Sequence, residues 1–289
     1  MNSTYHTAHV RDLHTVAPGT FVVATDQGAR LDAAEPGQFV MLRPDWGRDP
    51  LLPRAFSILR RTGDRVEYLI KVMGRGTALL ARLQPGDRIS VLGPLGRPFP
   101  RPIPAPDAGV VTDVLVAGGV GLAPLLWYAE QVQRGGATRA SLHFLYGARR
   151  AADLVLLEDV AATGADVILT TEDGSCPPGR GPETVVTGRV TAALERLLFS
   201  RPGSRSAPLR PETTRILACG PNPMMRAVAE LAQAANVPCL VSLEGDMACG
   251  VGVCLGCPVP SVPSPRDPRP YRYCCIDGPV FDAREIVIP

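Results

Sequence analysis

The stretch Val114-Leu115-Val116-Ala117-Gly118-Gly119-Val120-Gly121-Leu122-Ala123-Pro124 passes from four apolar residues through a glycine-rich turn into a second apolar segment. This pattern predicts a strand, a tight turn and a helix that continues to Val132. Such a turn lets a phosphate-bearing ligand approach the backbone at the start of the helix. It is not a standard G-x-G-x-x-G motif, and a tight turn without a ligand explains it equally well.

Strands and helices alternate on both sides of this turn, which predicts a parallel sheet covered by helices over residues 106–242. A second turn, Ala218–Met225, also joins a strand to a helix, so the two turns are expected to meet where strand ends converge. The segments Gly174–Gly188 and Ser200–Thr214 are predicted to be exposed loops. The expected elements are strands at Val114–Ala117, Ser141–Tyr146, Val167–Thr170, Ile216–Cys219 and Leu240–Leu243, and helices at Leu122–Val132 and Met224–Ala235.

Residues 1–105 show a different rhythm of short strands separated by turns, which predicts a small antiparallel barrel. One helix, Thr77–Leu83, is expected to interrupt it, with Pro85-Gly86 beyond its end. The expected strands are Thr20–Ala24, Gln38–Leu42, Ala55–Leu59, Arg65–Val72 and Arg88–Leu92.

One barrel strand contains Pro53-Arg54-Ala55-Phe56-Ser57, and Lys71–Thr77 follows further along the chain. An arginine on a strand can neutralise a pyrophosphate through two parallel hydrogen bonds. Phe56 would share the face of Arg54, and Ser57 could bond the edge of a heterocycle. A short strand with a solvated arginine accounts for the same residues.

Five of the eight cysteines lie between residues 249 and 275. Cys249, Cys254 and Cys257 have the C-x4-C-x2-C spacing that, with a distant fourth cysteine, is typical of a plant-type two-iron, two-sulfur site. A four-thiolate zinc site is the alternative, although it more often uses two C-x2-C pairs. Spacing alone leaves the fourth ligand open between Cys274 and Cys275. The surrounding segment, 243–289, is predicted to be a small irregular domain with a final strand at Glu285–Ile288.

Composition excludes several classes of protein. The chain has 289 residues and a formal net charge of +2, which gives no indication of nucleic-acid binding. No apolar run has the roughly 18 residues that a membrane-spanning helix needs, and the N-terminus lacks the pattern of a secretory leader. We therefore expect a cytoplasmic protein without nucleic-acid or membrane partners.

Taken in order, the Arg-x-Phe-Ser strand, the Gly118–Pro124 turn and Cys219-Gly220-Pro221 resemble the ferredoxin-NADP reductase superfamily. The C-terminal stretches Leu243–Cys257 and Cys275–Phe281 resemble the electron-transfer subunits of class 1B dihydroorotate dehydrogenases. The resemblance implies an FAD-binding barrel, an NAD-binding α/β domain and a [2Fe-2S] domain, divided as 1–105, 106–242 and 243–289.

The resemblance also implies the site residues. FAD would be held by Arg54, Ala55, Phe56, Ser57, Leu69, Ile70, Lys71, Gly76 and Thr77, with Gly76 and Thr77 bonding its pyrophosphate at the start of a helix. NAD would lie on Gly118, Gly119, Gly121, Pro124, Cys219, Gly220 and Pro221. The cluster would be held by Cys249, Cys254, Cys257 and Cys275, since the family places its fourth cysteine two residues before Asp-Gly-Pro.

Two features depart from the family pattern. Pro98 stands where the family usually has glycine, so a flavin contact from the Gly93–Phe99 loop is in doubt, because proline has no N–H group. About a dozen residues are inserted between Glu172–Ser175 and Gly188–Thr191, and this insertion could reshape the nucleotide pocket.

The resulting hypothesis is a subunit that passes electrons between NAD and an FMN-containing dihydroorotate dehydrogenase catalytic subunit, in pyrimidine biosynthesis. By resemblance, two copies of each chain would assemble. No side chain is predicted to act as a catalytic nucleophile. A reductase subunit for another acceptor, of the sulfhydrogenase or ferredoxin-NADP reductase type, is the nearest alternative, and a zinc-stapled nucleotide-binding regulator is the alternative of another class. NAD and NADP are not distinguished.

Overall fold

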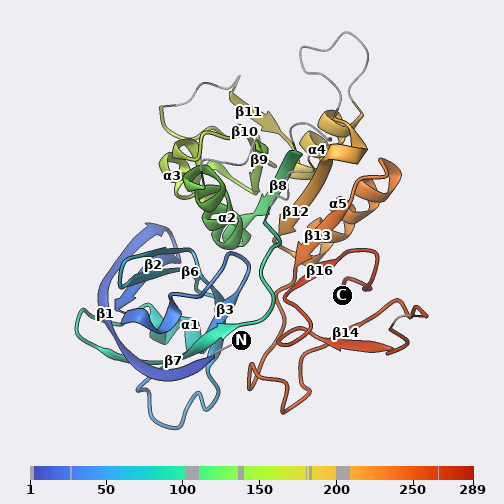
Figure 1. Ribbon diagram of the computed structural model, residues 1–289. Coiled ribbons are helices and arrows are strands. Elements are labelled where there is room, and N and C mark those ends of the chain that lie inside the picture. The colour runs from blue at the N-terminus through green and yellow to red at the C-terminus, as the bar shows by residue number, and fades with distance from the viewer. Residues whose placement is uncertain are drawn as a thin grey trace.

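The computed structural model describes residues 3–26, 28–101, 111–135, 140–179, 181, 184–199, 209–265 and 267–289. Figure 1 shows an N-terminal β domain, an α/β domain beside it and a C-terminal segment of loops and short strands that contacts both. The predicted boundary at residue 105 lies outside the described residues. Among those residues, none of the helices has the length and apolar character needed to cross a membrane.

The N-terminal domain is a seven-stranded sheet in the order β4-β3-β7-β1-β2-β6-β5. Its antiparallel β architecture confirms the predicted fold class, and it has two strands more than the five that the sequence predicted. Apolar residues on its inner face form one core, with Val23 and Ile89 fully buried. Its strands are β1 (Thr4–Ala17), β2 (Thr20–Asp26), β3 (Phe39–Pro44), β4 (Arg54–Ser57), β5 (Arg60–Thr62), β6 (Arg65–Lys71) and β7 (Arg88–Leu95), with a 3-10 turn η1 (Gly28–Leu31).

Sequence reasoning missed the longest strand, β1. Its inward-facing residues alternate with exposed ones, but they include His6 and the small Ala8, so the apolar signal of period two is weak. The predicted helix Thr77–Leu83 was also misplaced. The helix α1 runs over Arg75–Leu80, so it starts two residues earlier and ends three residues earlier, because Gly74 precedes its first turn and Thr77 lies inside it.

The α/β domain has a seven-stranded sheet in the order β11-β10-β9-β8-β12-β13-β16, parallel except for its last strand. Helices α2 and α3 cover one face, and α4 and α5 cover the other. The elements are β8 (Val111–Gly118), β9 (Ala140–Ala148), β10 (Asp166–Thr171), β11 (Val185–Thr187), β12 (Thr214–Cys219) and β13 (Cys239–Ser242), the helices α2 (Leu122–Arg134), α3 (Leu157–Ala162), α4 (Val190–Leu198) and α5 (Asn222–Ala234), and the 3-10 turns η2 (Gly119–Gly121), η3 (Ala151–Asp153) and η5 (Pro211–Thr213).

Part of the segment Gly174–Gly188 is not the exposed loop that composition predicted. It contains β11, which pairs in parallel with β10 and buries Val185 at the edge of the sheet. Residues 180, 182 and 183 of this segment lie outside the described part of the chain, as do residues 200–208 of the second predicted loop. Pairing with β10, and not a local sequence pattern, makes residues 185–187 a strand. Three residues are too few for a periodic pattern to be recognised in the sequence.

The C-terminal segment differs from the prediction in its strands. Glu285–Ile288 is not a strand: Ile286 makes an isolated bridge to Ser261. The strands are β14 (Pro258–Pro260), β15 (Tyr271–Tyr273) and β16 (Val280–Asp282). Strand β16 pairs with β13 as the antiparallel edge of the α/β sheet, so β13 is not the closing strand that the sequence suggested.

Helix α2 fastens the α/β domain to the barrel. Trp127 of this helix is 1% exposed and belongs to the core of the barrel, whereas Tyr128 packs into the α/β core. Arg60 on β5 donates to Glu130 of α2 at 2.8 Å and to Asp159 of α3 at 2.5 Å. These contacts place the carboxyl ends of the parallel strands beside the barrel.

Candidate functional site: two glycine turns, an edge strand and a cysteine loop

The two predicted nucleotide turns lie against each other. Ala117 and Cys219 are register partners at the ends of β8 and β12. A Cβ at Gly121 would lie 2.3 Å from the Cys219 carbonyl oxygen, and one at Gly118 would lie 3.0 Å from Pro221 Cδ. Only glycine permits this approach, so the residues Gly118–Gly121 and Cys219–Pro221 form one surface, as predicted.

Cys219 is buried beneath this surface. Burial raises the pKa of its thiol well above the usual range, and the nearby Glu244 raises it further. The thiol is therefore protonated at neutral pH and is not a nucleophile. Pro124 is also buried, in the first turn of α2. Glu244 was not among the predicted site residues, because a lone glutamate in a loop carries no spacing signal.

The predicted flavin strand β6 contacts the η2 turn. Leu69 shares a core with Leu122, the first residue of α2. Leu69 and Ile70 are 5% and 1% exposed, so their side chains pack into the protein and only their backbone could face a ligand. Lys71, at the end of the strand, is exposed. The barrel and nucleotide residues thus meet at β6.

Arg54 and Gly76 come together from separate elements. Arg54 begins β4, an edge strand of the barrel sheet, and Gly76 lies in the first turn of α1. A Cβ at position 76 would lie 2.7 Å from Arg54 Nε, so glycine is required for the guanidinium to lie over the helix start. A guanidinium and helical N–H groups on one face suit a pyrophosphate, and these residues fit FAD.

The other predicted flavin residues have distinct surroundings. The hydroxyl of Thr77 accepts from the N–H groups of Met73 and Gly74 at 2.9 and 3.1 Å, so it holds the start of α1. Ala55, Phe56 and Ser57 are all half-buried along β4. Phe56 packs against the barrel core, and Ala55 packs against the core that contains the cysteines.

The four predicted cluster ligands gather at the C-terminal segment. Cys257 directly precedes β14, and Cys275 follows β15 by two residues, so the short hairpin places their sulfur atoms 3.3 Å apart. In the loop before them, the N–H groups of Val251 and Cys254 point at the sulfur of Cys249, at 3.4 and 3.5 Å. The Cys254 side chain also hydrogen-bonds the Cys249 sulfur, so the four thiols lie as two pairs, Cys249 with Cys254 and Cys257 with Cys275.

The cysteine loop favours negative charge. Burial opposes ionisation of Cys249, but the backbone N–H groups of Cys254 and Val251 outweigh it and lower the pKa of this thiol to about 6. Gly250 and Gly252 have φ angles of +75° and +80°, which favour glycine and let the loop curl so that its N–H groups converge. Convergent N–H groups are suited to the sulfur atoms of a cluster.

Cys274, the alternative fourth ligand, points elsewhere. Its thiol is buried and donates to the carbonyl oxygen of Leu243 at 3.6 Å, whereas Cys275 contacts Cys257. This geometry favours Cys275. Within the described residues, no three His, Cys, Asp or Glu side chains are arranged as ligands of a single metal ion. Two pairs of thiolates fit a two-iron cluster, which needs one pair for each iron, better than they fit one zinc ion.

The loop Gly93–Phe99, which differs from the family pattern at Pro98, has a structural role that the sequence did not predict. The Arg97 N–H donates to the Gly278 carbonyl oxygen at 2.6 Å, and a Cβ at Gly96 would lie 2.4 Å from Pro279 Cδ. Pro98 lacks an N–H group, but its neighbour Phe99 donates to Pro36 at 2.8 Å. The loop therefore binds the cysteine domain to the barrel.

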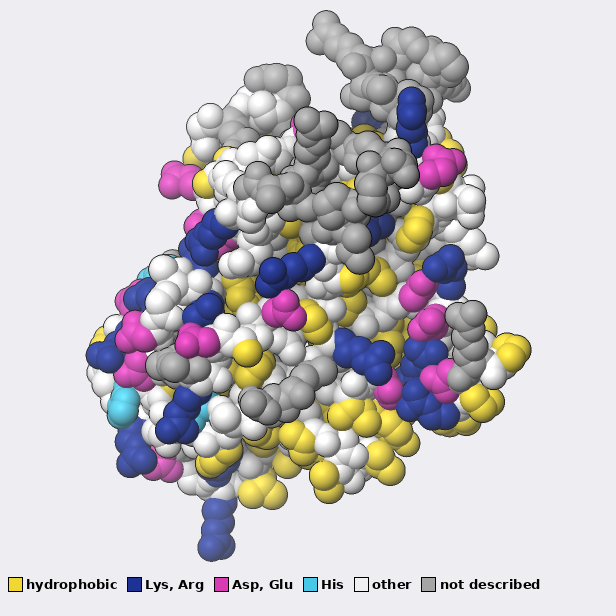
Figure 2. Space-filling model, viewed as in Figure 1, with side chains coloured by type: hydrophobic (Ala, Val, Ile, Leu, Met, Phe, Trp, Pro, Cys, Tyr) yellow, Lys and Arg dark blue, Asp and Glu magenta, His cyan; other side chains and the backbone are white. Residues whose placement is uncertain are grey.

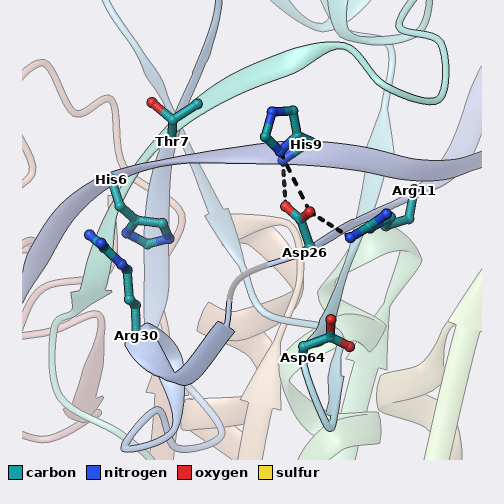
Figure 3. A pocket seen from close by; sticks show the side chains of 7 residues that line it. All are labelled: His6, Thr7, His9, Arg11, Asp26, Arg30 and Asp64. Carbon is teal, nitrogen blue, oxygen red and sulfur yellow. Dashed lines mark hydrogen bonds and ion pairs between the residues drawn. The ribbon is translucent and has the colours of Figure 1, made fainter.

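A hollow of about 510 Å³ lies away from these residues, beside strand β1 of the barrel (Figure 3). In it, Asp26 accepts from the His9 backbone at 2.6 Å and pairs with Arg11 at 2.9 Å. None of its lining residues belongs to the predicted site. Those residues are His6, Thr7, His9, Arg11, Asp26, Arg30 and Asp64.

Comparison with known families gives two matches. Residues 115–230 match the oxidoreductase NAD-binding domain. Residues 244–287 match the iron-sulfur cluster binding domain of dihydroorotate dehydrogenase B. These ranges contain the glycine turns and the four cysteines, respectively.

Among solved structures, the chain is similar to one described as an NADH-dependent reduced ferredoxin-NADP oxidoreductase. The TM-score is 0.76 at 24% identity, and the match covers 100% of this chain and 92% of the other. The cytochrome b5 reductase domain of Ulva prolifera nitrate reductase gives a TM-score of 0.63 at 19% identity, over 80% of this chain and 93% of the other. These similarities confirm the predicted fold class.

Curated relatives are more specific. The dihydroorotate dehydrogenase B (NAD(+)) electron transfer subunit of Desulforamulus reducens is 32% identical, over 97% of each chain. The subunit of the same name from Bacillus caldolyticus is 38% identical, over 88% of this chain and 87% of its own. The chain therefore belongs to the family of electron transfer subunits of NAD-dependent dihydroorotate dehydrogenase B.

Proposed function

We propose that this chain carries electrons between the FMN of a dihydroorotate dehydrogenase catalytic subunit and NAD, through a [2Fe-2S] cluster and FAD, in pyrimidine biosynthesis. One observation carries the proposal: the predicted sites form an uninterrupted series. The η2 turn contacts β6, β6 contacts β4, and β4 pairs with β3, on which the cysteine loop packs.

Flavin, when bound, supplies the conversion between hydride transfer and single-electron transfer, and the chain supplies position and exclusion of water. Arg54 would neutralise the pyrophosphate over Gly76. The buried Met41 and Leu95 fill the space between the cysteine loop and the barrel, at 1% and 4% exposure. No side chain at these contacts needs to form a covalent bond with a substrate, because the cofactors carry the redox chemistry.

The surface around the cysteine loop suits a protein partner. Val253 is 81% exposed, and Val251, Leu255 and Ile276 are between 41% and 52% exposed. Figure 2 shows hydrophobic side chains gathered in the lower part of the molecule, over the C-terminal loops of Figure 1. Exposed apolar patches mark interaction sites in soluble proteins. We call Val251, Val253, Leu255 and Ile276 the docking rim. We propose that the docking rim contacts the catalytic subunit and that the complex contains two copies of each chain.

The test combines the chain with its FMN-containing catalytic subunit under anaerobic conditions. We expect the mixture to reduce NAD with dihydroorotate, to contain flavin and two irons per copy of this chain, and to elute as a complex with equal numbers of both chains. Loss of dihydroorotate-dependent NAD reduction when both cofactors are present would contradict the proposal.

A Val253→Asp variant tests the docking rim, because a charge at the centre of an apolar contact must be desolvated on binding. We expect complex formation to weaken while the spectrum of the isolated chain stays unchanged. Val287→Asp is the matched control, since Val287 is 54% exposed on the same domain but lies outside the rim. Equal binding by the two variants would contradict the assignment of the rim.

The alternative of another electron acceptor is separated by the same preparation. Reduced protein is mixed separately with the catalytic subunit, with ferredoxin and with polysulfide, and the rate of electron transfer is measured for each. The true acceptor is the one that is reduced fastest. The similarity in fold to a ferredoxin-NADP oxidoreductase makes ferredoxin the first acceptor to compare.

A further inference from the structure

We infer that Asp277 and Arg269 form a clamp that positions Cys275, and that this clamp determines how firmly the fourth ligand holds the cluster. This inference rests on the proposed function, since it assumes that Cys275 is a ligand. Neither residue is among the predicted site residues. Both act on Cys275 through the backbone and are positioning residues.

Asp277 closes the turn that carries Cys274 and Cys275 from both sides. Its backbone N–H donates to the Tyr273 carbonyl oxygen at 2.8 Å, and its carboxylate accepts from the Tyr273 N–H at 2.8 Å. Asp277 is buried, with an exposed fraction of 8%. A buried carboxylate with fixed donors is costly to disturb, so the turn has one preferred conformation.

Arg269 supplies the opposite charge. Its guanidinium donates to both carboxylate oxygens of Asp277 at 3.2 to 3.3 Å, and it is itself held by Asp267 at 2.8 and 2.9 Å. The guanidinium therefore lies between two carboxylates. Arg269 therefore compensates the negative charge of Asp277. Removing one partner of such a pair leaves a buried charge without compensation, which is destabilising.

The clamp is tied to the third ligand as well. The Cys274 N–H donates to the Cys257 carbonyl oxygen at 2.9 Å, where β14 begins. The turn is therefore held at both ends, by Asp277 and by the backbone of Cys257. As a result, the Cys275 sulfur lies 3.3 Å from the Cys257 sulfur. Groups that orient a ligand commonly change metal affinity by about 10- to 100-fold when they are replaced.

The same hairpin provides a matched control. Arg272 pairs with Glu285 at 2.5 Å, and Glu285 is half-exposed. This ion pair fastens β15 to the C-terminal end. Arg272 also pairs with Asp267 at 3.4 Å, and this second pair remains when Glu285 is replaced. Glu285→Gln therefore removes a salt bridge from the same small domain while leaving the bonds between Asp267, Arg269 and Asp277 in place.

The experiment uses the full chain loaded with FAD and cluster, and compares wild type with Asp277→Asn, Arg269→Gln and Glu285→Gln. The readouts are the rate of iron release to a ferrous chelator after reduction, the EPR spectrum of the reduced cluster, and the melting temperature. We expect the two clamp variants to release iron about 10-fold faster and to show altered EPR spectra. Glu285→Gln should match wild type in the rate of iron release and in the EPR spectrum.

Wild-type iron release and EPR spectra in both clamp variants would overturn the inference, as would equal changes in all three variants, which would indicate general loosening of the hairpin. If Asp277→Asn does not fold, Arg269→Gln decides, because Arg269 is half-exposed. The proposed function is tested separately: wild-type protein without any cluster would overturn it, whereas a cluster that is lost in Cys275→Ser and unaffected in the clamp variants would overturn the clamp alone.

Discussion

Gly250 lies so close to Met41 that a Cβ at position 250 would be 2.6 Å from Met41 Cγ. Gly250 belongs to the predicted cluster loop, and Met41 belongs to β3, where it is the register partner of Ala55 on the predicted flavin strand. The buried Met41 side chain therefore connects the cysteine loop to the strand that pairs with the predicted flavin strand.

Replacing Gly250 by alanine should disturb this contact. The residue has a φ angle of +75°, which costs about 1–2 kcal/mol for a side chain, and the added methyl group meets Met41. We expect a lower melting temperature and less iron per chain, with flavin retained. Gly245→Ala is the control in the same domain, because its Cβ would meet only Cys274, at 3.5 and 3.6 Å, and Cys274 is not a predicted ligand. Equal iron content in both variants would contradict the proposed packing.

Arg54→Ala should weaken FAD binding by about 1.5–3 kcal/mol, which is roughly a 10- to 150-fold rise in the dissociation constant. The reason is the loss of charge-assisted hydrogen bonds to the pyrophosphate. Flavin retained after dilution and filtration measures the effect. Arg75→Ala is the control, since Arg75 lies beside Gly76 in the first turn of α1 but pairs with Asp49 at 2.9 Å. Similar flavin loss from the two variants would count against Arg54.

The two adjacent cysteines should behave differently. Cys275→Ser is expected to lose most of the iron and sulfide, because its sulfur contacts that of Cys257. Cys274→Ser is expected to retain both, since its thiol faces the Leu243 carbonyl oxygen and a hydroxyl can donate there as well. Iron and sulfide analysis with the visible spectrum separates the variants, and the reverse pattern would assign Cys274 as the ligand.

Arg60→Met should destabilise the junction of the barrel and the α/β domain. Arg60 is 22% exposed and bonds Glu130 and Asp159, so its loss removes the cation that pairs with Asp159 and leaves Glu130 paired with Arg134 alone, at 3.7 Å. We expect a loss of about 1.5–3 kcal/mol in the free energy of unfolding, measured by urea denaturation. Arg61→Met, which breaks only a pair within the barrel with Asp32, should cost less. A larger effect of Arg61→Met would refute the role of Arg60.

Asp282 on β16 should contribute stability that depends on pH. Burial acts to raise its pKa, but Arg284 outweighs burial and lowers the pKa below the usual 3.8. The folded state therefore binds this proton less tightly, so the contribution is present above about pH 4 and is lost as pH falls through the folded pKa. Urea midpoints of wild type and Asp282→Asn should differ at pH 7, and the difference should shrink as the pH falls below about 4. A constant difference would contradict the ion pair.

Much of the architecture followed from local patterns. The alternation of β8, η2 and α2, and of β12 and α5, was predicted because glycine turns and apolar periods are encoded within a few residues. Strand β1 and strand β11 were missed for opposite reasons: β1 has weak inward residues, and β11 is too short for a period to show. The helix α1 was shifted because both Gly74 and Thr77 can precede a helix.

The sequence alone identified three features: the spacing of Cys249, Cys254 and Cys257, the glycine turns, and the strand that contains Arg54. Each of them lies within one continuous segment whose backbone conformation is set by its own residues. The contact of Cys275 with Cys257, the packing of Gly250 against Met41 and the use of the Gly93–Phe99 loop as a connection between domains come from packing between segments remote in sequence. Contacts of that kind depend on the positions of whole strands, and no local pattern of residues encodes those positions.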